Sequence, residues 1–185
     1  MAIRDNVLID TSKRLFYLSD DVDNESMGKI CFNLLNLLQE DDEKDKKEKE
    51  YTRDPIKMYI NSRGGTLWDM WSLIDIMLDS RTPIYTYCTG CAMSAGFKIF
   101  LAGSKRFVSK NATLLYHQGS NTLWGKYMDV VQQKEEFDRA QKSIEEFVIS
   151  RTKITQSKLD KIRTEKIDWY IHSDEVEKLG IAEVI

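Results

Sequence analysis

The sequence has little of what marks membrane, secreted or nucleic-acid-binding proteins. No apolar run reaches the length needed to cross a membrane. The first ten residues, MAIRDNVLID, are interrupted by charges and contain no apolar core, so we expect no secretory signal there. The net charge of -3 argues against a nucleic-acid partner, which usually needs a basic face. These absences predict a cytoplasmic protein with no membrane or nucleic-acid partner.

Cysteine is also scarce, and the odd number of three is typical of a reducing compartment. Cys88 and Cys91 form a C-x-x-C pair, but a redox pair would place its first cysteine at a helix N-terminus, and the next helix is expected later, near Ser94. A zinc site needs about four ligands, and no second C-x-x-C is present. We therefore expect no metal and no cofactor, and we interpret these cysteines as small packing residues.

The chain has only two histidines, so candidates for a general base are few. His117 ends a predicted strand, and the ends of parallel strands are where active sites gather. A purely structural histidine is the alternative at that position. His172 lies in the polar stretch WYIHSDE and is more simply interpreted as a surface residue.

The order of predicted elements indicates one α/β domain over residues 1–185, with a mainly parallel sheet. A helix capped by Asp23 or Asn24 follows the first predicted strand, and its apolar spacing is strongly amphipathic. Further strands and helices alternate along the chain. We expect strands at 14–18, 56–60, 84–88, about 106–108 and 113–117, and helices at 67–79 and 126–150.

Two segments stand apart from this alternation. Residues 40–50, EDDEKDKKEKE, are all charged and lie in an insertion at about 39–54. Such a run cannot enter a core, so we expect a solvated helix extension or a mobile loop without chemistry. Residues 126–150 contain neither glycine nor proline and predict a helix of about 37 Å. That helix is too long to bury against a small domain, so part of it is expected to reach a partner subunit.

A candidate nucleophile lies in the stretch TGCAMSAGFKIF, residues 89–100. Ser94 is surrounded by the small residues Ala92, Ala95 and Gly96, which is typical of a sharp strand-to-helix turn that exposes a serine. Backbone N–H groups at a helix N-terminus can also face an oxyanion. The alternative is a serine where a helix packs closely on a sheet. A dyad with Lys98 is a further alternative, although a lysine one turn along the same helix would point away from the hydroxyl.

Glycines after the second main strand are candidates for the oxyanion site. Gly64 and Gly65 follow the predicted strand 56–60, and their missing side chains would let backbone approach a ligand closely. A plain tight turn is the alternative interpretation. A serine protease needs such donors together with a base and a carboxylate that orients it.

Three motifs in register resemble the family of the Clp protease proteolytic subunit. They are INSRGG at 60–65, CAMSAG at 91–96 and LLYHQG at 114–119. The family's G-x-A-x-S-x-G pattern is met in full by Gly90, Ala92, Ser94 and Gly96. The resemblance runs from about residue 14 to residue 185 with one large insertion.

The resemblance implies a catalytic triad of Ser94 as nucleophile, His117 as general base and Asp168 as the orienting carboxylate, with Asp160 and Asp174 as rivals for the last role. Gly65 and Ala95 would supply the oxyanion N–H groups, and Gly64 would belong to the substrate-binding strand at 60–65, where an extended substrate pairs through its backbone.

The fold implied by the resemblance is a spiral of ββα units shared with crotonases, with residues 126–150 as a protruding handle helix. The implied assembly is a double heptameric ring that encloses a chamber and cuts unfolded polypeptides.

Departures from the family pattern leave alternatives open. Arg63 and Gly119 replace family prolines, and Lys57 replaces an aromatic residue of the unfoldase docking strand, so ordinary docking to a hexameric AAA+ ATPase is not expected. A non-catalytic ring subunit and a crotonase-type acyl-CoA enzyme are the alternative functions. The crotonase alternative is disfavoured by the intact set of serine, histidine and aspartate.

Overall fold

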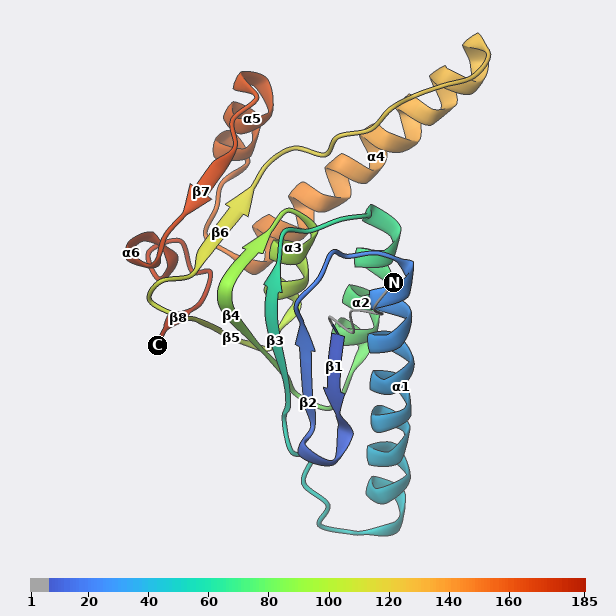
Figure 1. Ribbon diagram of the computed structural model, residues 1–185, viewed down its shortest axis with the longest axis vertical. Helices are drawn as coiled ribbons and strands as arrows, with labels where there is room; N and C mark the ends of the chain where they lie inside the picture. Colours follow the sequence, from blue (N-terminus) through green and yellow to red (C-terminus); the bar gives the residue numbers. More distant parts are fainter. Residues whose placement is uncertain (1–6) are drawn as a thin grey trace, which may run out of the picture.

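The computed structural model describes residues 7–185 and contains a mixed sheet flanked by helices (Figure 1). The main sheet order is β1-β2-β3-β4-β5-β8, and β6 pairs with β4 and with β7. Pairing is parallel except between β1 and β2 and between β6 and β7. The strands are β1 (Val7–Asp10), β2 (Leu15–Leu18), β3 (Ile56–Ser62), β4 (Ile84–Met93), β5 (Lys105–Val108), β6 (Thr113–Tyr116), β7 (Trp169–Ile171) and β8 (Glu183–Val184).

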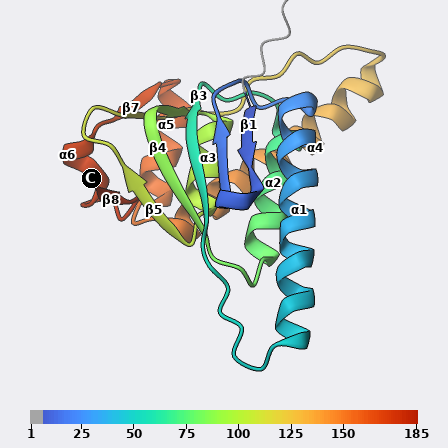
Figure 2. The ribbon, with the colours of Figure 1, turned by 60° about the horizontal axis from the view of Figure 1, so that its bottom comes forward.

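The helices follow the strands in repeating strand–helix units, which confirms the predicted α/β class. In both ribbon views α1 and α2 lie side by side against the sheet (Figures 1 and 2). The shorter α3 packs between α2 and α4. The helices are α1 (Asn24–Lys47), α2 (Leu67–Asp79), α3 (Ala95–Ala102), α4 (Tyr127–Arg151), α5 (Gln156–Glu165) and α6 (Ser173–Val176), with a 3₁₀ turn η1 (Thr11–Lys13).

Helix α1 begins at a reciprocal cap. The Asp23 carboxylate accepts a hydrogen bond from the Ser26 backbone N–H, and the Asp23 backbone N–H donates to the Ser26 hydroxyl. Asp23 is therefore the cap, and Asn24 is the first helical residue. The buried face includes Leu34 and Leu37.

The charged run corrects one expectation from the sequence. It continues α1 as far as Lys47, so the helix extension is confirmed, but the statement that the run cannot enter a core is wrong for Asp41. The Asp41 carboxylate is fully buried and accepts hydrogen bonds from Arg14, Tyr51 and Thr82. A carboxylate can be buried when its lone pairs are satisfied in this way.

The N-terminal edge of the sheet also differs from the prediction. The strand predicted at 14–18 is the second strand, because β1 (Val7–Asp10) precedes it and pairs with it in antiparallel register. The 3₁₀ turn between the two strands is capped by the Asp10 side chain, which accepts from the Lys13 N–H. Four residues without clear alternation are too short a signal to identify as a strand.

Strand β4 is longer than predicted and ends at the candidate nucleophile. It was expected to end at Cys88, but it continues to Met93 through an irregularity in its pairing with β3, where the register shifts between the pairs Ile60–Cys88 and Ser62–Ala92. Past this shift β4 pairs with β6, which joins Met93 to Leu115. The extension brings the ends of β4 and β6 together.

Helix α4 projects from the body of the molecule, as expected for the handle (Figure 1). Its C-terminal half packs on the core through residues such as Ile144 and Phe147, whereas the chain at its N-terminal tip exposes Trp124, Tyr127 and Met128. No helix in residues 7–185 is both long and apolar enough to cross a membrane.

Candidate active site

Ser94 occupies a sharp turn between β4 and α3. Its φ of 52° and ψ of -117° lie in a region that residues other than glycine rarely adopt. The turn is held by a hydrogen bond of 3.0 Å from the Ser94 N–H to the Leu115 carbonyl of β6. Gly96 permits close packing behind it, because a Cβ there would lie 3.2 Å from the Ser62 Cβ. This geometry is that of a nucleophile elbow.

Gly64 and Gly65 pass directly beside this turn, and both have positive φ. A Cβ on Gly64 would lie 2.7 Å from the Ser94 Cβ and 2.9 Å from the Ala95 nitrogen. A Cβ on Gly65 would lie 2.0 Å from the Val22 carbonyl oxygen. No side chain fits at either position, so both glycines are required by close approach of backbone to backbone.

Two backbone donors remain free at this junction. The Gly64 N–H donates to the Ser62 hydroxyl at 3.1 Å, so it is already used. Gly65 and Val22 form a parallel bridge. Its two hydrogen bonds join Val22 to the residues on either side of Gly65, namely Gly64 and Thr66. The N–H of Gly65 itself therefore points away from Val22. Within the described part of the chain, neither the Gly65 N–H nor the Ala95 N–H has an acceptor. These two groups border the same pocket as Ser94 and can bind an oxyanion.

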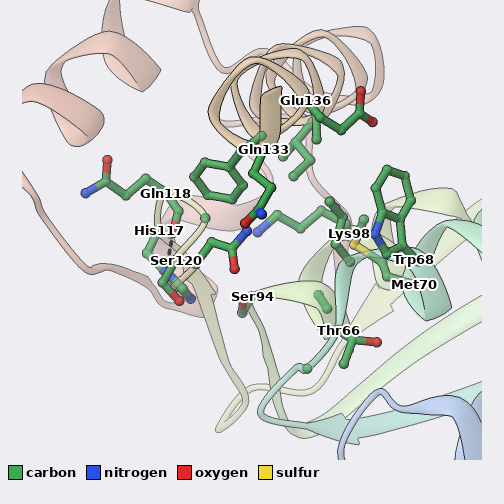
Figure 3. A pocket seen from close by; sticks show the side chains of 18 of the residues that line it. Thr66, Trp68, Met70, Ser94, Lys98, His117, Gln118, Ser120, Gln133 and Glu136 are labelled. Carbon is green, nitrogen blue, oxygen red and sulfur yellow. Dashed lines mark hydrogen bonds between the residues drawn. The ribbon is translucent and has the colours of Figure 1, made fainter. Parts of the chain in front are cut away.

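His117 follows the last residue of β6 and borders the same pocket as Ser94. Its Nδ1 lies 2.6 Å from the Gln118 carbonyl oxygen, the contact dashed in Figure 3. Because a carbonyl can only accept, Nδ1 carries the proton, and in the neutral ring Nε2 is left with the lone pair. That is the tautomer a general base needs.

Asp168 lies directly before β7 and is exposed. The antiparallel register pairs Tyr116 with Trp169, and His117 and Asp168 are the next residues beyond this last pair. Over residues 7–185 no hydrogen bond joins Ser94, His117 and Asp168 to one another.

The rival aspartates lie elsewhere. Asp160 is on α5 and accepts hydrogen bonds from Gln156 and Arg163. Asp174 is exposed on the short helix α6. Neither adjoins the β6–β7 pair, whereas Asp168 directly precedes Trp169, the partner of Tyr116.

The pocket has a volume of about 720 Å³ and lies between the elbow and the base of α4 (Figure 3). The side chain of Lys98 was expected to point away from the Ser94 hydroxyl. Lys98 lines this pocket and is only 4% exposed. Its side chain reaches from α3 into the pocket in the direction of Gln133 (Figure 3). Burial lowers the pKa of Lys98 to about 7.

Sequence reasoning also missed a support for the turn after His117. The Gly119 N–H donates to the Gln141 side-chain oxygen of α4 at 2.9 Å. The Gln141 amide in turn donates to the buried Glu145 at 2.9 Å. The position of the His117 turn is therefore tied to the base of the handle helix. A glutamine in the middle of a polar helix carries no signal of such a role.

The C-x-x-C pair behaves as packing residues. Cys88 is fully buried in β4, and burial raises the pKa of its thiol to about 12. Cys91 points its sulfur toward the Asn61 side-chain oxygen at 3.6 Å, and burial raises its thiol pKa as well. Both shifts disfavour the reactive thiolate.

Comparison with known proteins gives one consistent result. The family model described as Clp protease matches residues 5–185. A proteolytic subunit 2 of the ATP-dependent Clp protease from Corynebacterium glutamicum is 32% identical over 152 residues, which cover 81% of this chain and 71% of that protein. The subunit 2 from Corynebacterium diphtheriae is 32% identical over 142 residues, covering 76% and 66%. The proteolytic subunit from Deinococcus radiodurans is 26% identical over 174 residues, covering 93% and 79%.

Proposed function

This chain belongs to the Clp protease family, and on that premise we propose that it is a serine endopeptidase that cuts unfolded polypeptides inside a barrel-shaped homo-oligomer. The observation that carries the proposal is the strained turn at Ser94, which Gly64 approaches closely and which shares a pocket with Gly65 and His117. A serine, a base and two free N–H donors around one cavity are the parts that acyl transfer requires.

The proposed reaction begins when the Ser94 hydroxyl attacks the scissile carbonyl. His117 takes the hydroxyl proton on Nε2, and the N–H groups of Gly65 and Ala95 bind the oxyanion that forms. His117 then returns the proton to the leaving amine, which departs and leaves an acyl-enzyme. Water attacks the acyl group by the same route, and Ser94 recovers its proton.

Asp168 is proposed to orient His117 during this cycle. The His117 Nδ1–H is donated to the Gln118 carbonyl in the structure. A rotation of the ring would redirect this proton to the carboxylate across the β6–β7 pair, where it would stabilise the imidazolium. Assembly of the oligomer is the proposed trigger, because the Gly119 turn is tied to α4 through Gln141.

Homo-oligomerisation is proposed from the exposed apolar side chains of the handle region. Trp124 is 87% exposed and Tyr127 is 81% exposed at the tip of α4. On α1, Phe32 is also exposed. Large aromatic side chains grouped on a projecting element are typical of an interface with another subunit.

The proposal is tested by labelling with a fluorophosphonate probe, followed by intact-mass analysis. We expect one adduct on the wild type, none on Ser94→Ala, and an undiminished adduct on Ser157→Ala, which removes an exposed hydroxyl of α5. An assembled wild-type oligomer that takes no label would contradict the proposal. That outcome would favour a non-catalytic ring subunit, a role consistent with the His117 ring being bound to Gln118.

A further inference from the structure

The pocket beside Ser94 contains a buried cation that the proposed reaction does not use. Lys98 lies one helical turn after Ser94 on α3, and its side chain is 4% exposed. Its side chain forms part of the same cavity wall as Ser94 and His117. Lysine is among the residues least often buried in proteins, and a buried lysine is normally paired.

Lys98 has no such pair. Among residues 7–185, the side chain of Lys98 makes no hydrogen bond or ion pair, and its ring contact is with Tyr116, whose centroid lies 4.9 Å from Nζ. Burial lowers the pKa of its ammonium to about 7, which reflects the same lack of a counter-ion. The Lys98 side chain is buried along its length and lines the cavity, so its ammonium can donate to an acceptor on a ligand bound there.

The carboxylates nearest to this cavity are already engaged. Glu136 lines the pocket, but its two oxygens accept from Arg139 at 2.6 and 2.8 Å. Glu145, which follows the lining residue Ile144 on α4, accepts from Gln141 and from Gln156, and pairs with Arg163 at 3.2 Å. Neither carboxylate pairs with Lys98 among the described residues, so a carboxylate that paired with it in this pocket would be supplied by a ligand.

The rest of the cavity has the character of a side-chain pocket. Its walls include apolar residues from α2 and α4 and neutral polar residues from the loop after His117, namely Met70, Phe137, Ile144, Ser120 and Asn121. A substrate carbonyl held by the Gly65 and Ala95 N–H groups would place the side chain of its own residue nearest to this cavity. Apolar walls would hold the methylene groups of that side chain, and Lys98 would face its end (Figure 3).

From this arrangement we propose that Lys98 selects an acidic residue, Asp or Glu, at the position whose carbonyl Ser94 attacks; the inference rests on the peptidase function proposed above. The substrate carboxylate accepts hydrogen bonds from the Lys98 ammonium and supplies the charge that the pocket lacks. A charge-assisted hydrogen bond in a desolvated pocket is short and strong. An amide of the same shape leaves the cation unpaired, so the pocket discriminates between isosteres.

The experiment uses peptides that differ only at this position, with Glu, Gln, Asp, Asn, Leu or Met, and measures kcat/KM on the assembled protein. We expect Glu over Gln and Asp over Asn by about tenfold to a hundredfold. In Lys98→Met, which keeps the length of the side chain, both ratios should fall to about one while Leu and Met substrates are cut better. Lys142→Met, a change to an exposed lysine of α4, should leave the ratios unaltered.

Two results would overturn the inference. One is a Glu-to-Gln ratio that is near one in the wild type or that is unchanged in Lys98→Met. The other is a folded Lys98→Met oligomer that takes no fluorophosphonate label, because the lysine would then be the base for Ser94. Both differ from failure of the proposed function, in which the wild type itself takes no label.

A second measurement needs no variant. Unfolded casein is digested by the wild type, and the new C-termini are identified by mass spectrometry. Acidic residues should be enriched at these C-termini several-fold over their frequency in casein. An enrichment of leucine and methionine without acidic residues would contradict the role of Lys98 even if Lys98→Met failed to fold.

Discussion

Asp41 and Lys98 are both charged and buried, yet their surroundings are opposite. Asp41, at the far end of α1, accepts hydrogen bonds from both terminal nitrogens of Arg14, from Tyr51 at 2.6 Å and from Thr82 at 2.7 Å. Lys98, in the pocket beside Ser94, has no polar partner among the described residues. The first charge is saturated by the fold, and the second is left open toward a cavity.

The pKa values of the two groups follow from this difference. Burial alone would raise the pKa of Asp41, but hydrogen bonds from Arg14, Tyr51 and Thr82 outweigh it and lower the pKa to about 2. Burial acts unopposed on Lys98 and lowers its pKa to about 7. The buried carboxylate with three hydrogen-bonding partners therefore stays ionised, whereas the unpaired amine beside Ser94 loses its proton more easily and faces a cavity open to a ligand.

The largest change in the free energy of unfolding is expected from removing the Asp41 carboxylate. Asp41→Ala leaves the Arg14 guanidinium without its carboxylate, and we expect the free energy of unfolding to fall by about 3 kcal/mol. Urea denaturation at equal protein concentration measures the change. Asp45→Ala, which removes a partly exposed partner of Arg53 and Arg81, is the matched control and should cost at most about 1 kcal/mol. Equal losses in the two variants would contradict a special role of the buried Asp41 carboxylate in stability.

A smaller loss of stability is expected when acid protonates the Asp41 carboxylate. Because the folded pKa of Asp41 is about 2 and its ordinary value is 3.8, its contribution is complete above about pH 4 and is lost as the pH falls toward 2. The loss amounts to about 2 kcal/mol. The difference in unfolding free energy between the wild type and Asp41→Asn, followed from pH 5 to pH 2, isolates this contribution from that of Asp10, which titrates in the same range. A difference that is constant over this range would refute the assignment.

The smallest change in stability is expected from replacing Lys98, and this change is a gain where the others are losses. Lys98→Met removes an unpaired buried cation, and we expect the protein to become more stable by about 1 kcal/mol at pH 7. The folded pKa of about 7 lies below the usual value of 10.5, so between these values the unfolded chain binds more protons and the wild type gains stability as the pH rises. The advantage of Lys98→Met should therefore shrink between pH 7 and pH 9, as measured by urea denaturation. A destabilised Lys98→Met would show that the lysine has a structural partner.

Parts of the fold were predictable because their signal is periodic and local. The range 67–79 predicted for α2 is confirmed, and the handle predicted at 126–150 is Tyr127–Arg151. The burial of Asp41 was not predictable, because a run of eleven charged residues resembles a solvated surface. Its partners Arg14 and Thr82 lie 27 and 41 residues away along the chain, and only the folded sheet brings them to α1.

The candidate site likewise contains residues that short motifs predict and one, Lys98, whose surroundings depend on distant segments. Ser94, His117 and the two glycines were identified from short motifs, since close backbone approach restricts the residue types at those positions. Lys98 was set aside because its place on the helix considered alone pointed away from the hydroxyl. The pocket that gives it a role is completed by α4, whose side chains come from more than thirty residues further along the sequence.

The backbone crossing at Ser94 also controls when the site can exist during synthesis. The turn is held by Leu115 of β6, and Gly64 and Gly65 are held by Val22, so no local fragment can form it. A chain emerging from a ribosome carries Ser94 before β6 and β7 are available to complete the pocket that Ser94 shares with His117. Contacts of such long range form together with the fold as a whole. Under the proposed mechanism, the Ser94 hydroxyl therefore becomes reactive only after the whole fold has formed.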